Sequence, residues 1–287
     1  MMKILTNTTK ISMALLLMGV LILPTSCKKD LLDQTPSDLL ASENFWKTDQ
    51  DATIALMSAY AAARAVFDRD YYFDGQAGEY TRVRGTSGTS GQILRGDAYQ
   101  GGSYGPSGYG ASFDKYFSYL YGSVNRANYV IENITNKMLP TATGAKLASL
   151  ESIIAEARLL RGMTYFRLIS MWGDVPYIGK IIYDNSEVTA LARMPIGQVK
   201  DSIMADFNYA VAKLPNKADA LGRSGKPAAL AFRGKLNLYW GSWKKNGWPE
   251  LEGFTQNAGE ATAAFTAAAP IASSTPSGSP GAGASSI

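Results

Sequence analysis

The stretch EARLLRGMTYFRLISMWGDVP, residues 156–176, decides the fold class of this 287-residue chain. Apolar residues recur along it and just before it at intervals of three and four, a spacing that places them on one face of an α-helix. Gly173 and Pro176 are residue types that end helices. We therefore predict a helix over residues 145–172. Its expected buried face consists of Leu147, Leu150, Ile154, Ala157, Tyr165, Leu168 and Trp172.

The same periodicity predicts four further helices, at about residues 48–67, 112–134, 195–214 and 227–243. The first begins at Thr48-Asp49-Gln50-Asp51, which is similar to a capping box. Sustained alternation of apolar and polar residues, which is typical of strands, is scarce, so the sequence predicts an all-α fold. The expected buried positions are Ile54, Met57, Ala61 and Ala65 in the first helix, Phe113, Phe117, Leu120, Val124, Ala127 and Val130 in the second, and Val199, Ile203, Phe207 and Ala210 in the third.

A short internal repeat supports a stack of helices. Residues 157–162 and 229–234 lie 72 residues apart, and both copies keep an alanine, a bulky apolar residue, an arginine and a glycine in the same places. This offset is near twice the tetratricopeptide period of about 34 residues. Because the full consensus is absent, the repeat predicts helical hairpins of a degenerate tetratricopeptide type. The alternative is a chance match between two alanine-rich helices.

A long segment rich in glycine and tyrosine, residues 71–110, interrupts the helices. It holds eleven of the 28 glycines and six of the 16 tyrosines, so we expect a loop. Tyrosine offers a flat apolar face and a hydroxyl to a sugar ring, and arginine offers charged hydrogen bonds. The alternative is a surface loop whose tyrosines pack on neighbouring helices or contact a partner. The candidate ligand-binding residues are Tyr80, Arg82, Arg84, Tyr99, Tyr104 and Tyr109.

Three tryptophans cluster late in the chain. Trp240 and Trp243 are three residues apart and share a helix face, so we expect them in the core. Trp248 lies between Gly247 and Pro249 and is expected at the surface.

The composition excludes several classes of site. The chain has no histidine, which rules out Ser-His-Asp and Cys-His nucleophilic sites and removes the commonest transition-metal ligand. One cysteine permits neither an intrachain disulfide nor a thiolate metal cluster. We therefore predict neither a metal nor a cofactor. The net charge of +4 falls to +2 after Ser26, and without a basic stripe we predict no binding to nucleic acid.

The first 26 residues have the pattern of a signal peptide. Residues 11–23 form an uncharged apolar run that is shorter than the roughly 20 residues a spanning helix needs. The only cysteine, Cys27, follows Pro24-Thr25-Ser26, an arrangement that resembles a bacterial lipobox. We therefore expect lipid chains on Cys27 to hold the protein at a membrane. The alternative is an ordinary secretory signal followed by an unrelated cysteine.

Several motifs together resemble the SusD/RagB family over about residues 27–250. In chain order they are Asn44-Phe45-Trp46-Lys47-Thr48, Asn125-Arg126-Ala127-Asn128, the stretch 156–176, Arg193-Met194-Pro195-Ile196 and Leu214-Pro215. The resemblance implies a mostly helical, lipid-anchored protein on the exterior of the outer membrane. Such a protein binds an oligosaccharide or another nutrient and delivers it to a TonB-dependent SusC-like transporter, without being an enzyme. It also implies that Arg158 and Arg161 belong to the scaffold, in structural salt bridges.

The resemblance suggests three parts: a lipoprotein signal peptide at 1–26, a SusD-like N-terminal helical domain at 27–256, and a low-complexity tail at 257–287. In residues 270–287, fifteen of 18 residues are Pro, Gly, Ser or Ala, so we expect disorder there. Family members continue beyond this point, and we expect a truncated or frame-shifted member.

Two other functions stay open at this stage. One is a lipid-anchored glycoside hydrolase that uses two carboxylates from the group Asp68, Asp70, Asp74, Glu79 and Asp97. The other is a structural partner of the transporter that does not bind the nutrient.

Overall fold

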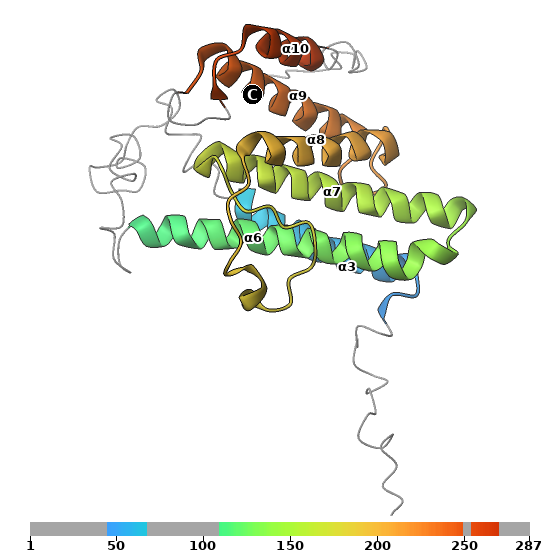
Figure 1. The fold of residues 1–287 in the computed structure, drawn as a ribbon. Coiled ribbons are helices and arrows are strands. Elements are labelled where there is room, and N and C mark those ends of the chain that lie inside the picture. Colours follow the sequence, from blue (N-terminus) through green and yellow to red (C-terminus); the bar gives the residue numbers. More distant parts are fainter. Residues whose placement is uncertain (1–44, 68–108, 249–253, 270–287) are drawn as a thin grey trace, which may run out of the picture. The chain divides into compact units, whose positions relative to one another are not determined.

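The computed structural model describes residues 45–67, 109–248 and 254–269 (Figure 1). Extended chain in this part forms one isolated antiparallel bridge, between Val175 and Met194. The prediction of an all-α fold is confirmed. The α-helices are α3 (Asp49–Phe67), α6 (Tyr109–Asn133), α7 (Gly144–Trp172), α8 (Ile196–Lys213), α9 (Lys226–Asn246) and α10 (Ala258–Ala268), with a π-helical turn at Ile134–Met138 and 3-10 turns at Leu139–Thr141 and Asn185–Val188.

The helices from α3 onward stack so that α7 lies at the centre (Figure 1). α7 packs on α3 and α6 on one side and on α8 on the other, while α9 packs on α8 and α10 packs on α9. We predicted a single buried face for α7. The structure corrects this, because neighbours on both sides bury Ile153, Leu159 and Phe166 in addition to the predicted Leu150 and Tyr165.

The predicted helix limits agree with the structure to within a few residues, and the predicted start of α3 is confirmed. The backbone N–H of Thr48 donates to Asp51 Oδ2 at 2.8 Å, and the N–H of Asp51 donates to Thr48 Oγ1 at 3.2 Å. α6 differs, since it begins at Tyr109, which we expected to lie in the preceding loop. Tyr109 continues the four-residue spacing of Phe113 and Phe117, so the helical pattern extends through it.

The predicted buried stripe of α3 is wrong at Ile54, Met57 and Ala61, which are exposed, and the side chain of Ala65 lies outside the described residues. Ile54 and Met57 are 50% and 40% exposed, whereas the buried face is formed by Ala52, Ala55, Leu56, Ala59 and Ala63. The alanines are small enough to let α3 approach both α6 and α7, and close packing favours this face over the one with the larger side chains. Of the predicted stripe in α6, Leu120, Val124, Ala127 and Val130 are fully buried, as predicted.

A buried carboxylate ties α3 to α7 and to the turn before α9. Glu156 of α7 accepts a hydrogen bond from the Tyr60 hydroxyl at 2.6 Å and forms an ion pair with Arg223. The backbone N–H of Ser224 donates to the same Tyr60 hydroxyl at 2.8 Å. Glu156, the first residue of the stretch 156–176, therefore has a structural role.

The two copies of the internal repeat occupy unlike surroundings. A Cβ atom added at Gly162 would lie 2.6 Å from the ring of Phe207, so this glycine allows α7 and α8 to pack closely. Arg161 is buried, whereas Arg233 makes a single exposed hydrogen bond of 3.3 Å to Asn208. The tetratricopeptide-type hairpin remains a prediction.

Helix α10 lies at the start of the stretch 257–287 that we predicted as a low-complexity tail, ahead of residues 270–287, for which we expect disorder and which lie outside the described residues. Asn257 caps α10 by accepting from the N–H of Glu260 at 3.0 Å. Glu260 in turn accepts from the indole N–H of Trp240 at 2.6 Å, which fixes α10 on α9. Alanine has the highest helix propensity, so this alanine-rich stretch with an asparagine cap forms a helix.

Candidate functional site

Most residues that we predicted as functional lie outside the described residues. This holds for Tyr80, Arg82, Arg84, Tyr99 and Tyr104, for the anchor residue Cys27, and for the acidic residues of the hydrolase alternative. Tyr109 is the first residue of α6. The structure therefore places the end of the glycine- and tyrosine-rich segment at the start of α6.

The chain between α7 and α8, residues 173–195, forms a loop that we call the connection. Its two ends are joined, because the N–H of Met194 donates to the carbonyl of Val175 at 3.0 Å and Arg193 donates to the carbonyl of Asp174 at 3.0 Å. The carboxylate of Asp174 also accepts from the N–H of Ile196 at 2.7 Å, which caps the first turn of α8. Gly173, with φ of 67°, provides the left-handed residue that ends α7.

Polar side chains of α6 hold the backbone of the connection. The amide group of Asn125 donates to the carbonyl of Ile182 at 2.8 Å and accepts from the N–H of Ile182, also at 2.8 Å. Asn128 donates to the carbonyls of Ile178 and Lys180, at 3.0 and 2.8 Å. These asparagines therefore replace the backbone partners that a neighbouring strand would provide.

Two tyrosine hydroxyls add to this attachment. Tyr121 donates to the carbonyl of Pro176 at 2.7 Å, and Tyr165 accepts from the N–H of Ile178 at 2.6 Å. Burial raises the pKa of both phenols, so both hydroxyls stay protonated at neutral pH.

A buried arginine lies beneath this attachment and joins it to α8. Arg161 donates to Asn128 Oδ1 at 2.8 Å and forms two hydrogen bonds, of 2.8 and 2.7 Å, to the carboxylate of Asp206. Burial alone would lower the pKa of Arg161, but the bonds and charge of Asp206 outweigh burial and raise it. Arg158 lies 3.3 Å from the same carboxylate and over the ring of Tyr209. The predicted structural salt bridges of Arg158 and Arg161 are confirmed.

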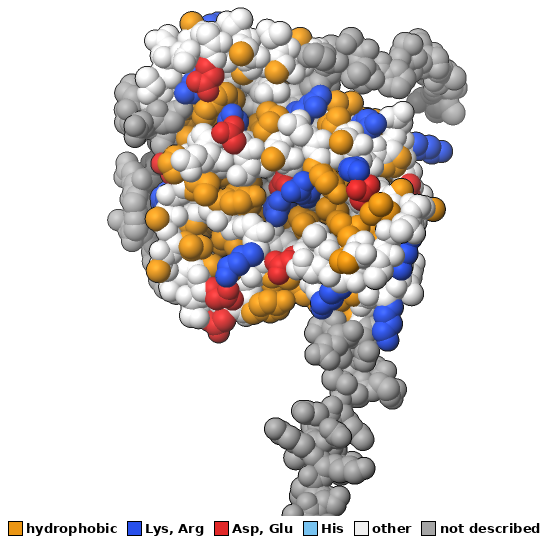
Figure 2. Space-filling view, turned by 45° about the vertical axis from the view of Figure 1, so that its right-hand side comes forward, with side chains coloured by type: hydrophobic (Ala, Val, Ile, Leu, Met, Phe, Trp, Pro, Cys, Tyr) orange, Lys and Arg blue, Asp and Glu red, His pale blue; other side chains and the backbone are white. Residues whose placement is uncertain are grey.

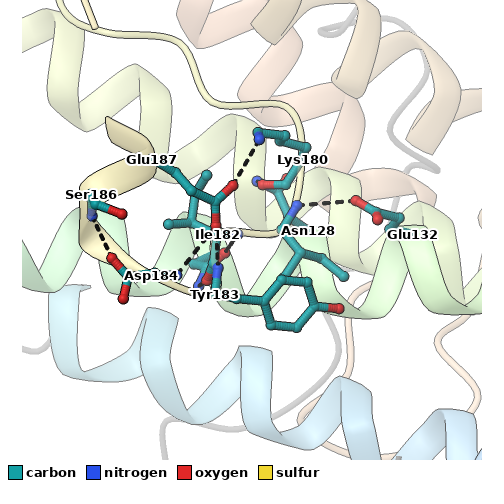
Figure 3. Close-up of polar contacts among 10 residues, drawn as sticks. Asn128, Glu132, Lys180, Ile182, Tyr183, Asp184, Ser186 and Glu187 are labelled. Atoms are coloured by element: carbon teal, nitrogen blue, oxygen red, sulfur yellow. Dashed lines mark hydrogen bonds and ion pairs between the residues drawn. The ribbon is translucent and has the colours of Figure 1, made fainter. Parts of the chain in front are cut away.

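The tip of the connection is held by a short polar cluster (Figure 3). Glu187 accepts from the backbone N–H groups of Tyr183 and Asp184, at 3.0 and 3.2 Å, and from the ammonium group of Lys180 at 2.8 Å. The hydrogen bond from Lys180 is the main cause that lowers the pKa of Glu187. Asp184 caps the 3-10 turn by accepting from the N–H of Ser186 at 2.7 Å. Tyr183 is 79% exposed.

A cavity of about 440 Å³ lies between α6 and the connection. Its walls are mostly apolar, and the residues that line it carry no charge: Phe117, Ser118, Tyr121, Gly122, Val124, Asn125, Pro176, Ile178, Ile182, Asn185, Val188 and Leu191. The rings of Phe117 and Tyr121 lie with their centroids 4.8 Å apart. Such walls suit an uncharged ligand with apolar faces, and the amide of Asn185 and the oxygen of Tyr121 can bond to its hydroxyls.

The cavity is near the predicted ligand-binding segment along the chain. Phe117 follows Tyr109 by eight residues, which is about 12 Å of helix at 1.5 Å per residue. The last two residues of the segment 71–110, Tyr109 and Gly110, therefore belong to the same helix that forms one wall of the cavity.

Sequence reasoning predicted the break between the helices that the connection fills, but it missed the contacts of the connection with α6. The available signal was the pair Asn125 and Asn128, which lie on the same side of a helix as the buried Val124 and Ala127. Amide groups on a buried helix face require hydrogen-bond partners from another part of the chain. Phe117 was predicted as a core residue, and it is partly buried at the cavity wall.

Three further observations concern the surface charges, the length of the helices and the groups that could bind a metal ion. On the face shown in Figure 2, basic and acidic side chains are interspersed among apolar ones. Within the described ranges, no helix has both the length and the apolar character needed to cross a membrane. The same ranges contain no group of three or more acidic or cysteine residues placed to bind a metal ion.

Comparisons with known proteins point to one family. A SusD-like family model, described as starch-binding associating with outer membrane, matches residues 95–238, which is half of the chain. A SusD-like protein of Formosa agariphila, P2, is 26% identical over 75% of this chain and 41% of its own length. A SusD homologue from Bacteroides thetaiotaomicron matches with a TM-score of 0.62 and 23% identity, over 81% of this chain and 42% of that one.

A laminarin-binding SusD-like protein also has a similar fold. It matches with a TM-score of 0.52 and 23% identity, over 70% of this chain and 42% of its own. The chain thus spans about two fifths of the length of these relatives.

Proposed function

Because this chain belongs to the SusD-like family, we propose that it binds an oligosaccharide at the outer surface of the outer membrane and delivers it to a TonB-dependent SusC-like transporter. The family match over half of the chain carries this proposal, since the family is described as starch-binding at the outer membrane. The uncharged, partly aromatic cavity beside α6 supports a neutral sugar ligand. The protein captures this ligand without cleaving it.

The proposed binding site combines the cavity wall of α6 with the preceding segment. Phe117 and Tyr121 supply aromatic faces, and Tyr80, Arg82, Arg84, Tyr99, Tyr104 and Tyr109 supply further aromatic and polar contacts. The position of Tyr109 in α6, eight residues before Phe117, supports this assignment.

Calorimetric titration with laminarihexaose and maltohexaose tests the proposal. We expect one of these glucans to bind, and we expect a variant with Tyr99→Ala, Tyr104→Ala and Tyr109→Ala to bind at least about tenfold more weakly. Each aromatic contact contributes on the order of 1 kcal/mol, and about 1.4 kcal/mol corresponds to tenfold in affinity. Tyr183→Ala is the matched control, because Tyr183 is an exposed tyrosine that does not line the cavity.

Several results would contradict the proposal in different ways. Unchanged affinity of the triple variant would move the site away from this segment. New reducing ends released from the glucan would favour the hydrolase. Copurification with the transporter without glucan binding would favour a structural partner.

The lipid anchor is tested by Cys27→Ser. We expect this variant to leave the membrane fraction for the soluble fraction after sedimentation, since the thiol that would carry the lipid is gone. The wild-type chain prepared in parallel is the control. If the variant still sediments with membranes, the anchor lies elsewhere.

A further inference from the structure

Three aromatic rings are stacked at the end of α9. The rings of Trp243 and Trp248 lie with centroids 4.9 Å apart and planes 22° apart, and Trp243 lies 5.1 Å from Phe254 at 24°. Trp248 and Phe254 are nearly parallel, with an angle of 4° between their planes. Phe254 is fully buried, whereas Trp248 is 41% exposed. The stack therefore connects the hydrophobic core to the surface.

The backbone around Trp248 is fixed at several points. Gly247, with φ of 75°, turns the chain out of α9, and the N–H of Trp248 donates to the carbonyl of Phe254 at 2.9 Å. The N–H of Asn257 and the side chain of Gln256 donate to the last carbonyls of α9, at 2.8 and 2.9 Å. Trp248 is held by its backbone and by the ring beneath it, so little conformational entropy remains to be lost on binding.

Trp248 differs from the other exposed aromatic side chains. Tyr119 and Tyr183 are also exposed, but neither stacks on another ring within the part of the chain that the structure describes. Among the described residues, none accepts a hydrogen bond from the indole N–H of Trp248.

The size of this apolar surface indicates the class of ligand. Among the described residues beside Trp248, Lys245, Asn246 and Gln256 are polar and exposed, so the apolar surface that the structure describes there is close to that of one indole ring. A stable protein interface buries about 800 Å² on each partner, far more than one ring offers. A pyranose ring matches, because its C–H face is flat and apolar and its hydroxyls reach the indole N–H and the neighbouring polar groups.

We infer that Trp248 is a platform on which one sugar ring of a neutral oligosaccharide stacks, in addition to the site beside α6. The inference rests on the proposed function, since it assumes an oligosaccharide ligand. Trp248 is not among the residues that line the cavity beside α6, so the two positions can be tested separately.

The test compares Trp248→Ala with Trp248→Phe by calorimetry, using laminarihexaose and maltohexaose. We expect the alanine variant to bind about tenfold more weakly, and the phenylalanine variant, which keeps a ring, to stay within about threefold of wild type. We also expect the bound glucan to change the tryptophan fluorescence of the wild type, and this change to decrease in Trp248→Phe. A purely structural role of Trp248 would not couple its emission to the ligand.

The outcomes separate this inference from the proposed function. If the wild type binds a glucan and Trp248→Ala binds it with equal affinity, the platform is refuted and the proposed function stands. If the alanine variant has a lower unfolding midpoint, the phenylalanine variant decides, because retained binding with reduced fluorescence change supports the platform and an undiminished change refutes it. If the wild type binds neither glucan, both proposals fail.

Discussion

An Arg161→Ala variant is expected to lose about 3–5 kcal/mol of the free energy of unfolding, the range observed when one partner of a buried ion pair is removed. The side chain of Arg161 is 6% exposed and that of Asp206 is 2% exposed. Without the guanidinium, Asp206 keeps only the longer contact with Arg158, and Asn128 Oδ1 loses its donor. Urea denaturation monitored by circular dichroism measures the loss.

The internal repeat provides a matched control for this variant. Arg233 occupies the place in the second copy that Arg161 occupies in the first, and its single hydrogen bond is exposed. Arg233→Ala should therefore change the free energy of unfolding by no more than about 0.5 kcal/mol. Equal losses in the two variants would show that the buried ion pair has no special role in stability.

An Asn128→Ala variant is expected to lose about 3 kcal/mol. The substitution removes the hydrogen bonds that Asn128 donates to the carbonyls of Ile178 and Lys180 and the one that it accepts from Arg161. Each lost hydrogen bond contributes on the order of 1 kcal/mol, although the carbonyl of Ile178 keeps the hydroxyl of Tyr165 at 3.2 Å. The connection should also detach locally from α6, so the backbone N–H of Ile182 should exchange hydrogen faster. Denaturation and hydrogen exchange measure the two effects.

Asn133→Ala is the control for Asn128→Ala. Asn133 is also a buried asparagine of α6, but the hydrogen bond of its amide goes to the carbonyl of Tyr129 in the same helix. We expect a loss of about 1 kcal/mol and unchanged exchange at Ile182. If both variants alter exchange at Ile182 equally, the connection is not held through Asn128.

The central helices could be predicted from the sequence because local pattern and tertiary packing agree there. In α8, the positions Val199, Ile203, Phe207 and Ala210 were predicted as buried and are fully buried. In α3 the local pattern and the tertiary packing disagree. Hydrophobicity favours burial of Ile54 and Met57, whereas close helix packing favours burial of the alanines. Single-sequence periodicity cannot decide between two apolar stripes on one helix.

The candidate site was harder to predict than the helices. The contacts that attach the connection join α6 to backbone groups about 50 residues further along the chain, and no local pattern encodes them. The exposed position of Trp248 was predicted from its glycine and proline neighbours and is confirmed. Its stacking on the ring of Trp243 was not predicted and is seen only in the structure. The predicted ligand-binding residues from Tyr80 to Tyr104 remain a prediction.

The way in which the connection is attached to α6 leaves the side chains of the cavity wall free to change. Asn125, Asn128, Tyr121 and Tyr165 bond to main-chain atoms, which every residue type supplies. The side chains on the connection's wall of the cavity, such as Ile178, Val188 and Leu191, are therefore free of any part in this attachment. They can be exchanged while the loop keeps its path, so one scaffold can carry cavity walls of different chemistry.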